Sequence, residues 1–283
     1  EEAGIFWLNQ VAPGSMQIYQ GKNEGYWYLS GTAMNLAGYL IQGQNYIAGQ
    51  NSSVNVPIGN LLGATGMSLY AYSQYAYFVD RQAIWKGTKR KTYLELMGAP
   101  WDYRNVLTPE VLPVVGMCAF NVIYTMLTPQ ANQRIGEWYS KDTVQFGGYG
   151  MSPALATGID FAWSLLTMTG VAIAEETASR GIVTGFLGTQ WSAPLFGAMH
   201  LGNILVQKPT PRNIINTCLQ AVFATGFGFY TDKIVADNQG DLSKTVALHF
   251  WWNVTVKAMY FLQDIINPPE TASGPATDTP ATD

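Results

Sequence analysis

The chain has 283 residues, of which 48% are hydrophobic, 13% aromatic and only 12% charged. An ordinary soluble domain carries about 25% Asp, Glu, Lys and Arg, so charges cover far less of this chain than usual. This composition excludes disorder for the body of the chain. Two cysteines exclude a disulfide framework, and 15 basic against 19 acidic residues speak against nucleic-acid binding.

The charges are unevenly distributed along the chain. Residues 25–79 contain no Asp, Glu, Lys or Arg, and 111–133, 181–207 and 213–231 are also free of them. Each stretch is close to or above the roughly 20 residues that a helix needs to cross about 30 Å of hydrocarbon. Mean hydropathy is only +0.04, because Gly, Tyr, Trp and uncharged polar residues, which membranes tolerate, are frequent. We therefore predict an all-α, polytopic transmembrane bundle of about seven helices with polar loops; a soluble all-helical protein is the alternative.

Residues 1–100 are predicted to form a membrane hairpin with a basic loop. The chain begins without Met, which fits either a removed targeting segment or an internal start. Residues 1–24 are a polar lead-in with a turn at Pro13-Gly14, and two apolar helices follow at about 26–42 and 57–79. Between them, 43–55 predicts an exposed connection. The second helix ends in four tyrosines that suit a membrane interface, namely Tyr70, Tyr72, Tyr75 and Tyr77.

A charged segment follows the hairpin. It contains five basic residues within eleven positions, Arg81, Lys86, Lys89, Arg90 and Lys91. The positive-inside rule places such a loop on the cytoplasmic side. A solvated loop whose charge only keeps it out of lipid is the alternative, and it predicts no side.

The remaining helices are expected in residues 101–267. They are predicted at about 107–127, 152–179, 181–207, 212–236 and 241–266, with polar loops over 128–150 and 237–244. Residues 268–283 are rich in Pro, Thr, Ala and Asp and have no apolar periodicity, which predicts a disordered tail.

Three ionisable residues interrupt an apolar helix. Glu175, Glu176 and Arg180 come directly after the uncharged stretch 161–174. Ionisable groups at membrane depth are costly, so they need partners and usually mark function. Glu176 and Arg180 are four residues apart and share a helix face, where they can pair. Glu175 is rotated by about 100°, so it needs another partner, a proton, or a role as a base.

Both histidines of the chain lie downstream in apolar helices. Phe196 lies one turn before His200, and Asn253 lies one turn after His249, so each pair shares a helix face. A single buried histidine is usually a structural residue with satisfied hydrogen bonds. Two histidines, an asparagine and a carboxylate pair on helices that can bundle instead predict one shared polar site.

In chain order these residues read EExxxR, FxxxH and HxxxN. They resemble the three signature motifs of the CPBP family of intramembrane glutamate proteases, which includes type II CAAX prenyl endopeptidases and bacterial bacteriocin-processing and Abi-like relatives. The resemblance covers about residues 107–266 and implies a CPBP-like helical protease core over 101–267. It does not cover the first hundred residues.

The resemblance implies an endopeptidase that hydrolyses a peptide bond of a membrane-associated protein or peptide. Glu175 matches the family's general base, which with His200 holds and activates a water. His249 and Asn253 match the pair that stabilises the oxyanion. The implied reaction is metal-independent and uses no cofactor. The matched supporting positions are Glu176, Arg180 and Phe196.

Two alternatives remain open. A glutamate and two histidines can ligate a divalent metal that keeps an open water position, although the chain has no HExxH motif. The chain can also be a non-catalytic scaffold or assembly subunit of a larger membrane complex, because helices rich in small residues pack well against protein. The intact motifs favour the enzyme, since a scaffold has no need of buried charges.

The expected partners are a protein or peptide substrate within the membrane and the lipid bilayer, with complex subunits under the scaffold alternative and no nucleic acid. The resemblance to bacterial members implies an integral protein of the bacterial inner membrane. A prenylated CAAX substrate is not expected there, since prenylation of a C-terminal Cys is a eukaryotic modification.

The N-terminal segment 13–22, followed by Gly25, Tyr26 and Trp27, resembles a small bacterial membrane hairpin module with a PGxxQxYxG pattern. Met16 stands where that module usually has Gly, and the resemblance implies no function. Aromatic anchors at a membrane interface are predicted here and before the third helix, at Tyr19, Tyr26, Trp27, Trp101 and Tyr103.

Overall fold

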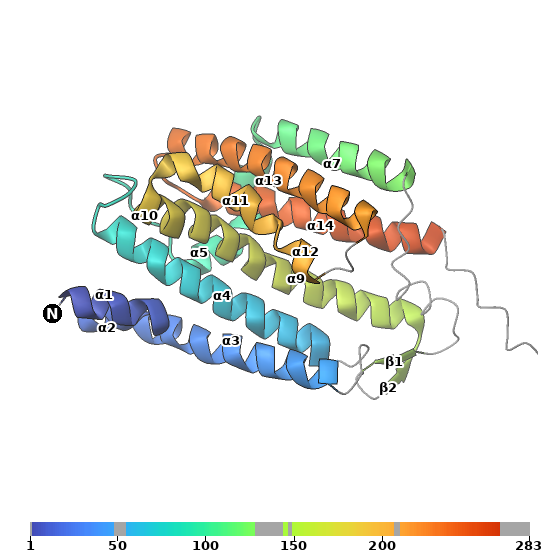
Figure 1. Cartoon of the computed structure of the whole chain (residues 1–283), viewed down its shortest axis with the longest axis horizontal. Coiled ribbons are helices and arrows are strands. Elements are labelled where there is room, and N and C mark those ends of the chain that lie inside the picture. Colours follow the sequence, from blue (N-terminus) through green and yellow to red (C-terminus); the bar gives the residue numbers. More distant parts are fainter. Residues whose placement is uncertain (1, 48–54, 128–143, 147–148, 207–209, 267–283) are drawn as a thin grey trace, which may run out of the picture.

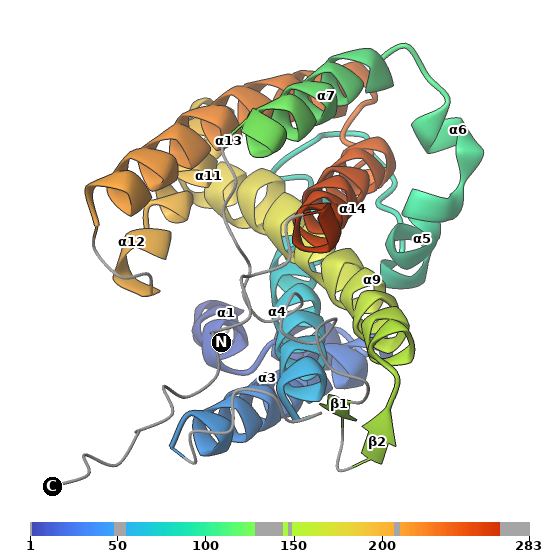
Figure 2. The same ribbon diagram turned by 90° about the vertical axis from the view of Figure 1, so that its right-hand side faces the viewer.

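Long helices dominate the chain (Figure 1). The structure, a computed structural model, describes residues 2–47, 55–127, 144–146, 149–206 and 210–266. The predicted tail and most of the polar loop over 128–150 lie outside these ranges. Viewed end-on, α4 and α9 lie in the middle of the bundle, with α1 and α3 on one side and α7, α11 and α13 on the other (Figure 2).

The N-terminal half contains two short helices and a long helical hairpin, followed by short elements and one further long helix. The predicted polar lead-in is largely helical, and Gly14 turns the chain between its two helices with a φ of 92°. The elements are α1 (Glu2–Val11), α2 (Ser15–Tyr19), α3 (Glu24–Ile47), α4 (Asn55–Asp80), α5 (Tyr93–Gly98), η1 (Ala99–Trp101), α6 (Tyr103–Val106) and α7 (Val111–Leu127).

The α3–α4 hairpin packs at glycines. A methyl group on Gly38 would lie 2.6 Å from the backbone nitrogen of Gly63, and one on Gly66 would lie 2.5 Å from that of Asn35. Any larger side chain at either position would separate the two backbones. The missing side chains therefore allow the close contact that membrane helices use in place of a hydrophobic driving force.

The C-terminal half begins with a small antiparallel hairpin, in which Gln145 pairs with Gly150. Ser152 caps the next helix by accepting a hydrogen bond from the Leu155 N–H, and Pro153 occupies its first turn, as is common at helix starts. The elements are β1 (Val144–Phe146), β2 (Tyr149–Met151), α9 (Pro153–Thr177), the π-helical turn η2 (Ala178–Val183), α10 (Thr184–Leu187), η3 (Thr189–Trp191), α11 (Ser192–His200), α12 (Asn203–Val206), α13 (Pro211–Asp237) and α14 (Ser243–Ile266).

The prediction of one helix over 181–207 is wrong. The helix that begins at Pro153 continues through η2 to Leu187 instead of ending at Ser179. It stops at Gly188, whose φ of 93° and ψ of 162° suit a residue without a side chain. The chain then turns into the separate helices α11 and α12. Glu175, Glu176 and Arg180 consequently lie within a continuous helix and not at its end.

The expectation of an interfacial tyrosine belt at the end of α4 is also wrong for two of its four members. Tyr72 and Tyr75 are 0% and 1% exposed and belong to the core that α4 forms with α9 and α14. The Tyr72 hydroxyl donates to the Lys91 carbonyl, and that of Tyr75 donates to the Gly240 carbonyl. A tyrosine whose hydroxyl has a hydrogen-bond partner can be buried in a core as well as placed at an interface. The residue type alone therefore does not distinguish the two locations.

One described stretch, Pro153–Leu187, is long and apolar enough to cross a membrane, and Val111–Phe120 is a shorter apolar helix. The element order confirms the all-α class apart from the small β hairpin. The seven-helix transmembrane count stays a prediction. In α3 and α4, frequent Gly, Ser, Asn and Gln residues lower the mean hydropathy.

Candidate active site

Glu175 and Glu176 lie at the end of α9, and Arg180 lies in the π-helical turn that follows. Two glycines fix this segment against α4. A methyl group on Gly181 would lie 2.7 Å from Cβ of Tyr75, and one on Gly185 would lie 2.6 Å from the ring of Phe78. The helix therefore sits close against α4, which determines the direction in which the two carboxylates point.

Glu176 is the centre of a fully buried polar group. Its Oε1 accepts a hydrogen bond from Nδ1 of His249 at 2.9 Å, and its Oε2 lies 3.4 Å from Nη1 of Arg180. Glu176 and Arg180 are both 0% exposed. The pairing predicted from helical spacing is present, but the bond to His249 crosses from α9 to α14 and was not predicted.

Arg180 reaches α13 through its remaining nitrogens. Nε lies 2.9 Å from Oδ1 of Asp232, and Nη2 donates to the Gly228 carbonyl at 2.9 Å and to the Thr231 hydroxyl. The guanidinium carbon also lies 5.4 Å from the ring centre of Phe196, within the range of a cation–π contact. This one side chain therefore connects three helices.

Asp232 is a member of the site that was not predicted. Besides its ion pair with Arg180, its Oδ1 accepts a hydrogen bond from the Ser192 hydroxyl at 2.8 Å, and it is 20% exposed. The signal in the sequence was an acidic residue directly after the uncharged stretch 213–231. The same reasoning that selected Glu175 would have found it.

Glu175 faces both histidines. Its Oε2 lies 3.4 Å from Nε2 of His249 and 4.0 Å from Nε2 of His200. Glu175 is 29% exposed and His200 is 20% exposed, whereas His249 is nearly buried at 5%. Three of the four predicted catalytic residues therefore meet, with both histidines facing one oxygen of Glu175 and the more exposed side formed by Glu175 and His200.

The hydrogen-bond partners of the two rings determine which nitrogen carries a proton. Nδ1 of His200 lies 2.8 Å from the Phe196 carbonyl, and Nδ1 of His249 lies 2.9 Å from the Glu176 carboxylate. A carbonyl or an ionised carboxylate can only accept, so both Nδ1 atoms are the donors. In the neutral rings, the lone pairs are therefore on the Nε2 atoms that face Glu175.

Phe196 packs between the two histidines. Its ring centre lies 5.1 Å from that of His200 and 5.8 Å from that of His249, both in edge-to-face geometry. Because Phe196 is 3% exposed and its carbonyl also holds His200, it constrains the orientation of both rings. This contact gives a physical reason for the aromatic position of the second motif.

Asn253 is half-buried on α14, one turn after His249. Its side chain makes no hydrogen bond to another residue in the part of the chain that the structure describes. It is therefore near the convergent group by helical spacing, but no contact joins it to Glu175 or His200.

Several buried polar atoms of this group have no hydrogen-bond partner among the described residues. They are Glu175 Oε2, Glu176 Oε2, Arg180 Nε and Arg180 Nη1. The short Arg180–Asp232 distance is therefore an ion pair without a well-directed hydrogen bond. Unsatisfied buried polar atoms are rare in native proteins, and a catalytic role and a bound water are two of their causes.

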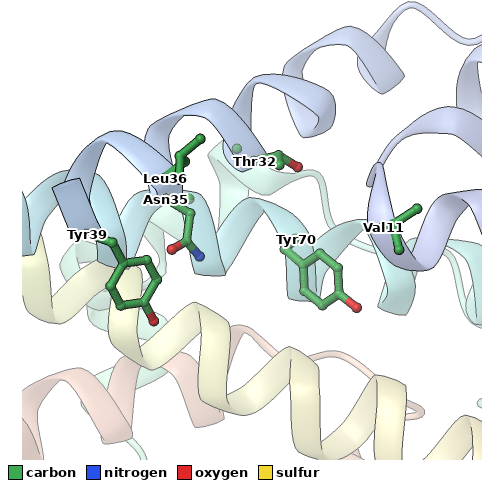
Figure 3. Close-up of a pocket in the computed structure, with 8 residues that line it drawn as sticks. Val11, Thr32, Asn35, Leu36, Tyr39 and Tyr70 are labelled. Carbon is green, nitrogen blue, oxygen red and sulfur yellow. The ribbon is translucent and has the colours of Figure 1, made fainter.

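The described residues contain no group of three or more His, Cys, Asp and Glu side chains with the arrangement of a metal site. They do contain a separate hollow of about 270 Å³ on the α3–α4 hairpin, beside α1. Thr32, Asn35, Tyr39 and Tyr70 lie around it, and none of the residues that line it is acidic, basic or histidine (Figure 3). The hollow therefore has no lining group that is charged at neutral pH.

A carboxylate that faces two histidine nitrogens inside a helical bundle is an arrangement that can activate a water molecule. Residues 157–255 match the family model described as type II CAAX prenyl endopeptidase Rce1-like. This segment includes all three motifs, and the match confirms the predicted resemblance to the CPBP family, which includes CAAX protease-type endopeptidases. Comparisons with curated proteins and with solved structures gave no significant match.

Proposed function

We propose that the protein is a metal-independent intramembrane glutamate endopeptidase. The single observation that carries this proposal is the convergence of Nε2 of His200 and Nε2 of His249 on Oε2 of Glu175. The match of residues 157–255 to a protease family supports it. The proposed substrate is a protein or peptide within the membrane, and the proposed location is the bacterial inner membrane.

Glu175 and His200 are the proposed water-activating pair. A distance of 4.0 Å between Oε2 and Nε2 is too long for a direct hydrogen bond, but it suits a water molecule between the two atoms. Glu175 takes one proton of that water while the water oxygen attacks the carbonyl carbon of the substrate. The tetrahedral intermediate then collapses, the C–N bond breaks, and the proton passes from Glu175 to the leaving amine, so that the carboxyl product gains the water oxygen and the amine product gains the proton.

His249 and Asn253 are the proposed stabilisers of the oxyanion. Asn253 has an amide that is free to donate in the described part of the chain, and preorganised donors of this kind contribute strongly to acyl transfer. Glu176 holds Nδ1 of His249 at 2.9 Å, so the ring presents Nε2 toward the reacting group, and as the doubly protonated imidazolium it donates from Nε2 to the oxyanion. Arg180 keeps Glu176 in place, and Phe196 keeps both rings oriented.

The test is hydrolysis by purified protein in proteoliposomes, with membrane-anchored peptides as substrates and mass spectrometry of the products. We expect Glu175→Gln to lower kcat by about 10³-fold or more, since a general base contributes about 10²–10⁴-fold. The matched control is Glu95→Gln, which makes the same change in an exposed helix cap and should keep full activity. Equal activity of Glu175→Gln and the wild type would overturn the assigned base.

Treatment with a chelator separates this mechanism from the metal alternative. We expect 1,10-phenanthroline and EDTA to leave the activity unchanged, because the proposed steps use only groups of the chain. Complete loss of activity that returns when Zn²⁺ is added would show instead that the Glu and His side chains act as metal ligands.

The scaffold alternative is supported by one observation: only one described stretch is apolar enough to meet the criterion for a membrane span. Less apolar helices suit contact with protein subunits better than contact with lipid. Native purification distinguishes the two. A stoichiometric complex that is inactive as a protease and unchanged by Glu175→Gln combined with His200→Ala would favour the scaffold.

A further inference from the structure

The loop between α4 and α5 reaches the proposed catalytic helix from outside the family match. It carries Trp85 with a φ of 47° and Gln82 with a φ of 56°. Bulky residues rarely adopt positive φ, and such backbone strain persists only where the surroundings enforce it. Contacts with neighbouring segments therefore hold the loop in a backbone conformation that its own residues do not favour.

The π-helical turn after Glu176 has an unusual hydrogen-bond pattern. The N–H of Thr184 donates to the carbonyls of Ser179 and Gly181. In an α-helix the same N–H would donate to the carbonyl of Arg180, four residues back. The Arg180 carbonyl thus loses its α-helical donor, and a buried carbonyl without a partner destabilises the fold.

Trp85 supplies the replacement donor. Its indole Nε1–H donates to the Arg180 carbonyl at 3.1 Å. We propose that Trp85 is a positioning residue for the reaction described under the proposed function: by holding the Arg180 carbonyl, it stabilises the π turn and thereby the orientation of Glu175 and Glu176. The inference rests on that proposed function for its effect on rate.

The surroundings of Trp85 hold its ring against the turn. A methyl group on Gly240 would lie 2.5 Å from Cβ of Trp85, so the loop between α13 and α14 packs directly against it. The Gly240 carbonyl accepts a hydrogen bond from the Tyr75 hydroxyl at 3.2 Å, and the Thr88 hydroxyl donates to the Gln239 carbonyl. Two loops and α4 therefore support one hydrogen bond.

Loss of the indole donor favours return of the turn to the α pattern. An α turn holds one residue fewer than the π turn. The helix before the turn therefore rotates by about 100° relative to the helix after it. The helix packs against α4 on both sides of the turn, at Gly170 before it and at Gly181 and Gly185 within and after it, so the rotation changes the orientation of Glu175 and Glu176 relative to Arg180. A displacement of this kind lowers the rate without removing any group that binds substrate.

The sharpest test replaces Trp85 with 3-benzothienylalanine, which has sulfur in place of the indole N–H and nearly the same shape. We expect kcat to fall about tenfold, the rate equivalent of one hydrogen bond, with KM unchanged. We also expect faster amide hydrogen exchange in residues 178–187. Trp85→Phe should show the same effects with an additional loss of stability.

Trp251 provides the matched control, because its indole donates to the Pro100 carbonyl at 2.9 Å, away from the π turn. The same analogue at position 251 should leave kcat and the exchange of residues 178–187 unchanged. A second pair compares Gly240→Ala, which pushes against Trp85, with Gly87→Ala, which has a similar positive φ and open space around it. Only Gly240→Ala should lower kcat.

Unchanged kcat and exchange in the Trp85 analogue would overturn the proposal, as would equal losses in the Trp251 analogue. A wild-type protein without hydrolytic activity would overturn the proposed function instead. In that case the exchange measurement still decides whether Trp85 holds the turn, so the two failures are distinguishable.

Discussion

Two arginines, each surrounded by carboxylates, illustrate two uses of charge in this molecule. Arg90, in the loop after α4, donates from Nε to Asp80 at 2.8 Å, from Nη1 to the Tyr72 hydroxyl at 2.7 Å and from Nη2 to Glu24. Arg180 is 0% exposed and has two nitrogens that make no hydrogen bond among the described residues. The first arginine is satisfied at the surface, and the second is buried and only partly satisfied.

The two arginine groups differ in how far water can reach their carboxylates. Asp80 and Glu24 are 25% and 31% exposed, so solvent shares their charge and the group can be fully satisfied. Burial opposes the ionisation of Asp80, but hydrogen bonds from Arg90 and Lys22 outweigh it and hold the pKa of Asp80 below its ordinary value. Around Arg180 only Asp232 is partly exposed, so the protein must supply most of the partners. Such a group is costly to keep and usually marks a functional site.

The largest expected effect is on stability at the buried arginine. Arg180→Met leaves Glu176 and Asp232 without their cation inside the bundle, and removal of one member of a buried ion pair typically costs about 3–5 kcal/mol. Arg90→Met is the matched control and should cost about 1 kcal/mol, because water can solvate the remaining carboxylates. The free energy of unfolding of both variants in mixed micelles checks this, and similar losses would remove the distinction between the two groups.

The next effect is on rate alone. Asn253→Ala should lower kcat by about 10²–10³-fold, the usual loss when one oxyanion donor is removed, and should be milder than Glu175→Gln. Stability should hardly change, because Asn253 has no hydrogen bond to lose in the described structure. Asn105→Ala removes an amide that donates to the Ala99 carbonyl at 3.0 Å and should leave kcat unchanged. A large loss of stability in Asn253→Ala would contradict the assigned role.

The smallest effect is a pH dependence at a third, more exposed ion pair. Nζ of Lys244 lies 2.8 Å from Oε1 of Glu110, and this hydrogen bond lowers the pKa of Glu110 from 4.5 to about 2. Since the folded pKa is the lower one, the contribution is present above pH 4.5 and is lost as the pH falls toward 2.

Lys244→Gln should therefore lower the thermal midpoint slightly at pH 7. The difference from the wild type should narrow between pH 4.5 and 2, and it should be small because solvent screens the pair. A gap that stays constant over this range would show that Lys244 stabilises α14 by some other contact.

Much of the candidate site followed from spacing within single helices. Glu176 with Arg180 and Phe196 with His200 are four residues apart, and helical geometry brings such residues together whatever surrounds them. The bond from Glu176 to His249 and the ion pair from Arg180 to Asp232 join different helices. Their geometry depends on how α9, α13 and α14 pack, which no spacing in the sequence reveals.

The sequence by itself determined the helical class, the scarcity of charge and the residues capable of acid–base chemistry, because these follow from composition and local periodicity. Only the tertiary structure decided that Gly188 ends the helix, that Tyr72 and Tyr75 are buried, and that Trp85 reaches the carbonyl of Arg180. Each of these depends on close approach between segments far apart in the chain. Such contacts are selected by packing and by the need to satisfy buried polar groups.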